Sequence, residues 1–259
     1  MSDWGNFLPN LVDAVLNDGP VAGLAPTKST QTAILELVQA GVGPLAARPS
    51  PSCTWAMTPG DPSCCPISLV LSPAAVGSTP AFRTQSNNSG MALTLVATNP
   101  GGIVLGDLMF AYLTCFKLYS DPSGAPAGWR RLCTAFEANS ATEFSLWFKY
   151  ASGSEPGQWN WTLQGGVANF WEAELDVYSG VAGSNAVPTP VLALLQAFWT
   201  NGQIPLLGAP TLIGSFPANS RMVCFMKPDG ANSPSGNPIV SGGSGVGTVR
   251  SPHVFDTVF

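Results

Sequence analysis

From Ile67 onward, the chain is a succession of short segments rich in aliphatic, β-branched and aromatic residues, separated by clusters of glycine, proline, asparagine and serine. Segments of this length and composition are typical of β-strands, and no helical segments alternate with them as a parallel sheet requires. We therefore expect an all-β fold, an antiparallel β-sandwich of jelly-roll-like type. The expected strands span 67–72, 91–97, 106–119, 130–138, 142–151, 159–163, 170–180 and 220–228.

Two stretches of this region are harder to assign. Residues 187–213 fit either a short helix at 191–199 or a strand interrupted by prolines. The Gly/Ser-rich residues 230–249 predict a loop or an extended arm. We group residues 67–259 as one β-sandwich domain that carries this C-terminal arm.

Residues 1–43 differ from the rest, because their apolar residues recur with helical spacing. One helix is predicted before Gly19, and a second between an N-cap at Ser29 or Thr30 and Gly41. Short helices cannot form a core alone, so they either cover a sheet of the main domain or anchor the chain to another subunit. The proline-rich residues 44–66 predict a linker or an extended arm. The candidate anchoring residues on the two helices are Leu8, Leu11, Val12, Val15, Leu16, Ile34, Leu37 and Val38.

The charge content limits which partners the chain can bind. Asp, Glu, Lys and Arg make up only 10% of the residues, against about 25% in an average soluble protein. With a net charge of −5 and no run of Lys or Arg, direct binding to nucleic acid is not expected. No apolar run reaches the ~18 residues of a membrane helix, and the N-terminus lacks the pattern of a secretory signal. So few charges suit a protein whose surface is largely covered by neighbouring subunits.

The acidic residues Glu172, Glu174 and Asp176 alternate with apolar residues, so a strand here places all three carboxylates on one face. Three readings follow from this pattern. Two of the carboxylates could share acid and nucleophile roles in glycan hydrolysis. All three could bind calcium with help from loop oxygens. The reading we favour is a solvated strand face, alone or paired with Arg130, Arg131, Lys149 or Arg221.

The remaining inventory argues against other chemistry. His253 is the single histidine and no CxxC motif occurs, which excludes a zinc site and a Ser-His triad. We therefore expect no catalytic residues, no metal and no cofactor. The cysteines are predicted to be buried thiols, with a bridge from Cys53 to Cys64 or Cys65 as the alternative in an oxidising setting.

Five sequence pieces occur in a fixed order in the middle of the chain. They are "GDLMFAYL" at 106–113, "PAGWRRL" at 126–132, "FSLWFKYA" at 144–151, "EPGQWNWTL" at 155–163 and "AELDVYSGV" at 173–181. This series resembles a β-sandwich domain that recurs in bacteriophage tail, fibre and other virion proteins and in some bacterial surface proteins. The likeness spans residues 91–181, and its fold-defining residues are Gly106, Asp107, Gly128, Trp129, Trp159 and Trp161. Within it, Lys149 and Asp107 are candidates for an ion pair.

The resemblance implies a structural module with no catalytic set, and hence not an enzyme. It implies a virion or adhesin-type module, and our first hypothesis is a virion protein of tail fibre, tail appendage or capsid cement type, assembled in the host cytoplasm. Its partners would be other virion proteins and further copies of itself, reached through the N-terminal helices and the arms. The alternative is a carbohydrate- or receptor-binding module that contacts a host surface glycan through Trp55, Trp159, Trp171 or Trp199. A glycan hydrolase using the acidic strand is the third hypothesis.

Overall fold

The fold is seen in a computed structural model, whose described part consists of strands and the turns between them, with no helix. The all-β prediction with antiparallel sheets is therefore confirmed for this part of the chain. Residues 1–47, which carry the predicted helices and their anchoring faces, lie outside it. The described residues are 48–49, 52–56, 65–116, 122–137, 142–163, 168–184, 191–196, 206–208, 213–214, 219–226, 239–241, 248–251 and 254–258.

A five-stranded antiparallel sheet in the order β4-β11-β6-β9-β8 lies at the centre of the molecule. Its strands are β4 (Ala81–Ala92), β6 (Leu108–Phe116), β8 (Arg130–Glu137), β9 (Thr142–Tyr150) and β11 (Asn169–Ser179). Residues directly opposite each other in neighbouring strands share a face of the sheet. One face, which we call the Tyr178 face, includes Glu172, Glu174, Asp176 and Tyr178 of β11 and Phe110 and Tyr112 of β6. The opposite face, which we call the Trp171 face, includes Trp171, Ala173, Leu175 and Val177 of β11 and Met109, Ala111 and Leu113 of β6.

The Tyr178 face packs against a second five-stranded antiparallel sheet, in the order β12-β3-β15-β18-β17. The strands are β3 (Ile67–Leu71), β12 (Val191–Gln196), β15 (Arg221–Phe225), β17 (Thr248–Ser251) and β18 (Val254–Val258). Phe225 meets the edges of Phe110 and Tyr112 at ring-centroid distances of 5.6 and 5.8 Å. Edge-to-face contacts of this kind are directional, so they help to fix how the two sheets meet.

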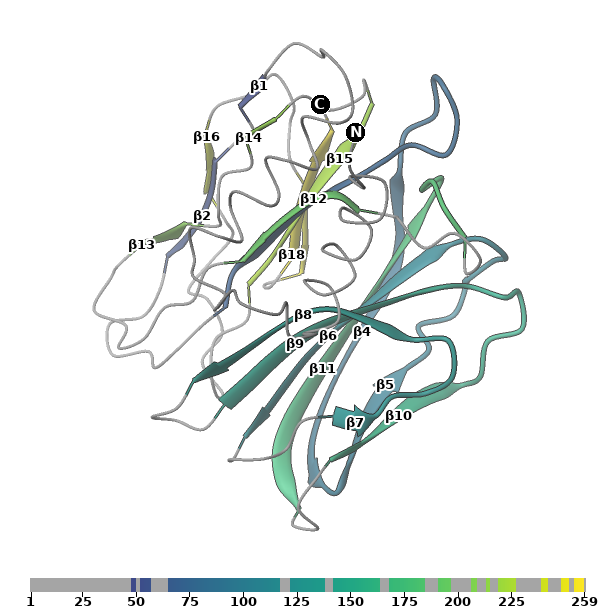
Figure 1. The fold of residues 1–259 in the computed structure, drawn as a ribbon, viewed down its shortest axis with the longest axis vertical. Helices are drawn as coiled ribbons and strands as arrows, with labels where there is room; N and C mark the ends of the chain where they lie inside the picture. The colour runs from purple at the N-terminus through teal and green to yellow at the C-terminus, as the bar shows by residue number, and fades with distance from the viewer. Residues whose placement is uncertain are drawn as a thin grey trace, which may run out of the picture.

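The Trp171 face is covered by a three-stranded antiparallel sheet in the order β5-β10-β7. Its strands are β5 (Thr94–Thr98), β7 (Pro122–Gly124) and β10 (Gln158–Leu163). Alternate residues of β10 are buried and exposed, as the sequence predicts, so Trp159 and Trp161 point into the core. The middle strands of the central sheet are thus covered on both faces, by β5 and β10 on one side and by β3, β15 and β18 on the other. Figure 1 shows β5 and β10 on one side of this sheet and β15 and β18 on the other.

Two small sheets involve the segments predicted to be arms. Within 44–66, β1 (Arg48–Pro49) pairs with β14 (Ile213–Gly214), and β2 (Ser52–Ala56) pairs with β13 (Leu206–Gly208) and β16 (Ile239–Ser241). The expectation of a loop over 230–249 is wrong for β16 and for the start of β17, because both add to sheets by backbone pairing. For residues 191–196, which the structure describes, the strand alternative is confirmed, since β12 pairs with β3.

Candidate functional site

The three carboxylates of β11 lie on the Tyr178 face, but they do not form a solvated row. The exposed fraction is 1% for Glu174 and 0% for Asp176, and Glu172 is half-buried. The favoured reading of a solvated strand face is therefore wrong for Glu174 and Asp176. The alternation predicted their common face correctly, but that face packs against the sheet built from β3, β12, β15, β17 and β18.

The second sheet brings a buried ionic group to this junction, which we call the Asp256 cluster: Arg221, Arg250 and Asp256. Asp256 is fully buried and accepts hydrogen bonds from both guanidinium groups. Arg250 Nε lies 2.7 Å from Asp256 Oδ2, and Arg250 Nη2 lies 3.0 Å from Asp256 Oδ1. Arg221 also donates to Asp256, with its side chain 10% exposed. Charge-assisted bonds of this kind are among the stronger hydrogen bonds in proteins.

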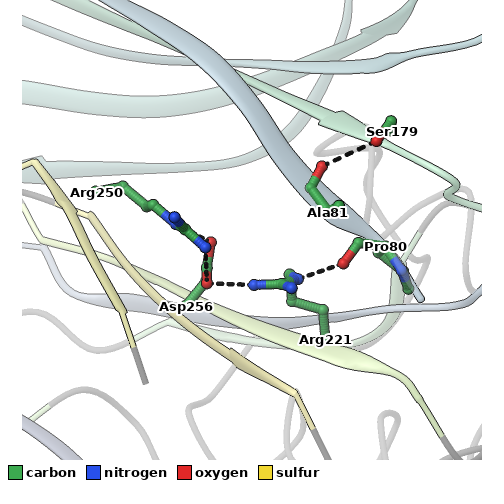
Figure 2. A network of polar contacts seen from close by, with 6 residues as sticks. All are labelled: Pro80, Ala81, Ser179, Arg221, Arg250 and Asp256. Atoms are coloured by element: carbon green, nitrogen blue, oxygen red, sulfur yellow. Dashed lines mark hydrogen bonds and ion pairs between the residues drawn. The ribbon is translucent and has the colours of Figure 1, made fainter. Parts of the chain in front are cut away.

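The Asp256 cluster ties the second sheet to the start of β4. Arg221 Nε donates to the backbone oxygen of Pro80 at 2.5 Å, just before β4 begins (Figure 2). On the next residue, the backbone oxygen of Ala81 accepts a hydrogen bond of 3.3 Å from Ser179 Oγ on β11. Arg250 lies 4.8 Å from the ring centroid of Phe82, a cation–π contact with β4. These contacts fix one end of the sheet junction.

The Asp256 cluster and Asp176 both act on the buried phenol of Tyr178. Burial raises the pKa of Tyr178 well above its usual value, and the negative charges of Asp256 and Asp176 raise it further. Arg221 and Arg250 act in the opposite direction on the same phenol. Two guanidinium groups and two carboxylates therefore act on Tyr178, and the phenol stays neutral. Buried charges require such compensation, because an isolated ion in the interior is costly.

Such an arrangement suits packing better than catalysis. A glycosidase needs its two carboxylates to face a sugar in a water-accessible site. Glu174 and Asp176 instead sit inside the junction between two sheets. Across the described ranges, no three His, Cys, Asp or Glu side chains lie together in a way that could hold a metal ion, so the calcium reading of Glu172, Glu174 and Asp176 finds no ligand set there.

The predicted aromatic residues form a buried group on the other side of the central sheet. Trp129, Trp159 and Trp161 are 6%, 3% and 0% exposed. The ring centroid of Trp129 lies 5.6 Å from that of Trp159 and 5.2 Å from that of Trp161. Trp171 is also buried, at 5% exposed, so neither it nor Trp159 offers a face on which a sugar ring could stack. The side chains of Trp55 and Trp199 lie outside what the structure describes.

The predicted turn residues occupy the positions that require them. Gly106 and Gly128 have φ angles of 84° and 85°, in the region that favours glycine. Asp107 is buried and binds Arg83, with Arg83 Nε 2.6 Å from Asp107 Oδ2. Its Oδ2 also accepts the backbone N–H of Val104 at 2.9 Å, closing the turn before β6.

Lys149 pairs with Glu155 and not with Asp107 as the sequence suggests. Lys149 Nζ lies 2.6 Å from Glu155 Oε2, while the backbone N–H and the hydroxyl of Ser152 donate to Glu155 Oε1 at 2.6 and 2.9 Å. Burial alone would raise the pKa of Glu155, but the hydrogen bonds from Lys149 and Ser152 and the charge of Lys149 outweigh it and lower this pKa. The pair holds the β9–β10 turn in place, with Lys149 Nζ 5.9 Å from the ring centroid of Trp159.

Sequence reasoning missed the Asp256 cluster. The sequence pattern that could have revealed this cluster is a single charged residue next to or within a largely apolar segment. Arg221 precedes "MVCFM", and Asp256 lies within "VFDTV". A lone charge in such a run is seldom buried unless it is paired. The prediction of buried thiols holds for Cys65, Cys115 and Cys224. Cys133 is also a thiol, but it is only half-buried. Cys64 and the side chain of Cys53 lie outside the described part.

In comparisons with known proteins, no family model, no curated protein and no solved structure matches this chain. In the described part of the chain, no helix has the length and apolar character needed to cross a membrane.

Proposed function

We propose that this protein is a non-enzymatic structural subunit of a bacteriophage virion, of tail fibre, tail appendage or capsid cement type. In this proposal, residues 67–259 form a jelly-roll-like sandwich presented outward. The N-terminal helices of residues 1–43 and the arms join it to neighbouring virion proteins and to further copies of the chain. The subunit is assembled in the host cytoplasm and carried on the particle.

The observation that carries the proposal is that the candidate catalytic and sugar-binding side chains are buried between the sheets. Glu174 and Asp176, two of the three catalytic candidates, are buried where two sheets meet. Trp159 and Trp171, two of the four sugar-binding candidates, are buried on the opposite face. When acids and aromatics serve the core in this way, a structural role fits the described part of the chain better than hydrolysis or glycan binding.

Composition supports the same role. Charged residues make up 10% of the chain, which is well below what a soluble protein uses to keep its whole surface in water. A subunit whose surface is covered by neighbours needs fewer charges. The ordered motif series from Gly106 to Val181, which resembles a virion sandwich domain, adds a second and independent line of support.

The test is to locate the protein on particles. Particles purified from a producing culture by density gradient are analysed by mass spectrometry, and a peptide antibody carrying gold is imaged by electron microscopy. We expect this chain to co-purify with the particles at a fixed ratio to the major capsid protein. Gold on the tail or on the capsid shell then distinguishes an appendage from a cement protein. Recovery only as a free monomer, with none on particles, would refute the proposal.

A further inference from the structure

Strand β4 forms one border of the central sheet, and no described strand pairs with its outer edge. From Thr84 to Ala92 it pairs with β11 in unbroken register over nine residues, with the only register shift before Thr84. Its neighbour β5 pairs with β10 and meets β4 through side chains, since Ser86 Oγ donates to the backbone oxygen of Thr98 and Asn88 Nδ2 lies 2.8 Å from Thr98 Oγ1. An edge of this length offers a row of backbone donors and acceptors to another chain.

The other described edge strands carry features that prevent such pairing. Strand β8 has a register shift between Arg131 and Cys133 and an exposed Arg130, and β12 and β17 also contain register shifts. Strand β7 has three residues and begins with Pro122. The remaining edges are five residues or shorter. Bulges, charges, prolines and shortness are the usual means by which proteins protect an edge, and the Thr84–Ala92 segment has none of them.

We propose that this edge binds the same edge of a second copy of the chain, as an antiparallel pair related by a two-fold axis. The segment "TQSNNSGMA" carries no charge, so two copies do not repel each other. Its Thr, Gln, Asn and Ser side chains both donate and accept hydrogen bonds, which makes the segment complementary to itself. A two-fold axis uses one surface on both subunits, so the pair is closed and does not extend into a fibre.

Maximal overlap of residues 84–92 with themselves fixes the register. Asn88 lies opposite its own copy, Asn87 opposite Ser89, and Gln85 opposite Met91. Asn87, Ser89 and Met91 are exposed in the single chain, with Met91 at 74%. Pairing would cover these side chains and form roughly eight to ten backbone hydrogen bonds. The two central sheets would then continue as one sheet across the axis.

The test exploits the pairing of Asn87 with Ser89. In the double variant Asn87→Lys/Ser89→Lys, two pairs of lysines face each other, and in Asn87→Glu/Ser89→Glu two pairs of glutamates do. Size-exclusion chromatography with light scattering at about 100 µM should show a dimer for the parent protein and a monomer for each variant, with dimerisation weakened at least about tenfold. An equimolar mixture of the two variants should restore the dimer, because each lysine then faces a glutamate.

The matched control is Gln158→Lys/Asn160→Lys, which adds the same charges at two exposed residues of β10, a strand flanked on both sides. This control should remain dimeric. A monomeric parent protein at this concentration, lysine variants of unchanged size, or a mixture that stays monomeric would each overturn the inference.

Hydrogen exchange on the parent protein provides a second test that needs no variants. The backbone amides of β4 should lose protection from exchange when the protein is diluted, whereas constant protection contradicts the pairing. The test uses purified protein, so its failure is distinct from absence of the chain on particles.

Discussion

The close contact between Gly90 and Trp171 provides the sharpest test of the packing on the Trp171 face. A Cβ added to Gly90 would lie 2.8 Å from Cζ2 and 3.1 Å from Cε2 of the indole. Carbon atoms in van der Waals contact are normally about 3.5–4.0 Å apart. Trp171 is buried in its cluster and cannot move away without disturbing its neighbours. Gly90→Ala should therefore overpack this site.

The size of the effect follows from two opposing contributions. Overpacking a filled core costs about 1–3 kcal/mol. Replacing glycine by alanine at an ordinary backbone conformation stabilises by about 0.4–1 kcal/mol, through the unfolded chain. We expect a net loss of roughly 1–2 kcal/mol in the free energy of unfolding for Gly90→Ala. Gly157→Ala is the matched control, because a Cβ there meets nothing within 4 Å, and it should be neutral or slightly stabilising.

Urea unfolding followed by tryptophan fluorescence measures both variants. A double-mutant cycle with Trp171→Phe removes the indole carbons that the new methyl group would meet, so Gly90→Ala should cost much less in that background. If Gly90→Ala is as neutral as Gly157→Ala, or if its cost is the same with Phe at position 171, then the contact does not limit the packing and the reasoning is refuted.

Three further predictions concern buried groups. Asp256→Asn leaves Arg221 without its buried counter-charge and should cost about 3–5 kcal/mol in urea unfolding; a loss below about 1 kcal/mol would contradict the buried cluster. Because the pKa of Glu155 is lowered in the folded state, its contribution to stability is present above the pKa of the unfolded carboxyl and is lost as pH falls through the folded value. Glu155→Gln should therefore destabilise at neutral pH and flatten the acid side of the stability profile, and an unchanged profile would contradict the Lys149–Glu155 pair. Trp161→Ala should cost about 3–5 kcal/mol and reduce the near-UV circular dichroism of the tryptophan group, whereas a nearly neutral variant would place Trp161 outside the core.

The sequence predicted which residues share a face more reliably than what covers that face. The alternation of β11 placed Glu172, Glu174 and Asp176 together correctly. It could not show that the face is covered, because the covering strands β3, β15 and β18 are far from β11 in the chain. The buried Trp159 and Trp161 were predictable, since β10 alternates strictly and has one exposed face.

Strand β4 escaped prediction for a related reason. Its "SNNSG" segment has the composition of a turn, yet it forms a regular strand because β11 supplies a complete backbone partner. The sequence also merged 91–97 into one strand, where the chain has the end of β4, a bend at Leu93 and then β5. Backbone pairing over a long range thus overrides local propensity in both places.

The position of β3 in the second sheet has a consequence for synthesis on the ribosome. All five residues of β3 are buried in the finished fold, and its partners β12 and β15 lie more than a hundred residues later in the chain. At about 5–20 residues per second, translation from Leu71 to Phe225 takes roughly 8–30 s. Throughout that interval, a strand that the finished fold buries completely has emerged before the strands that cover it. Chaperone binding at β3 should therefore raise the yield of folded protein, and this yield should fall when translation slows between β11 and β15.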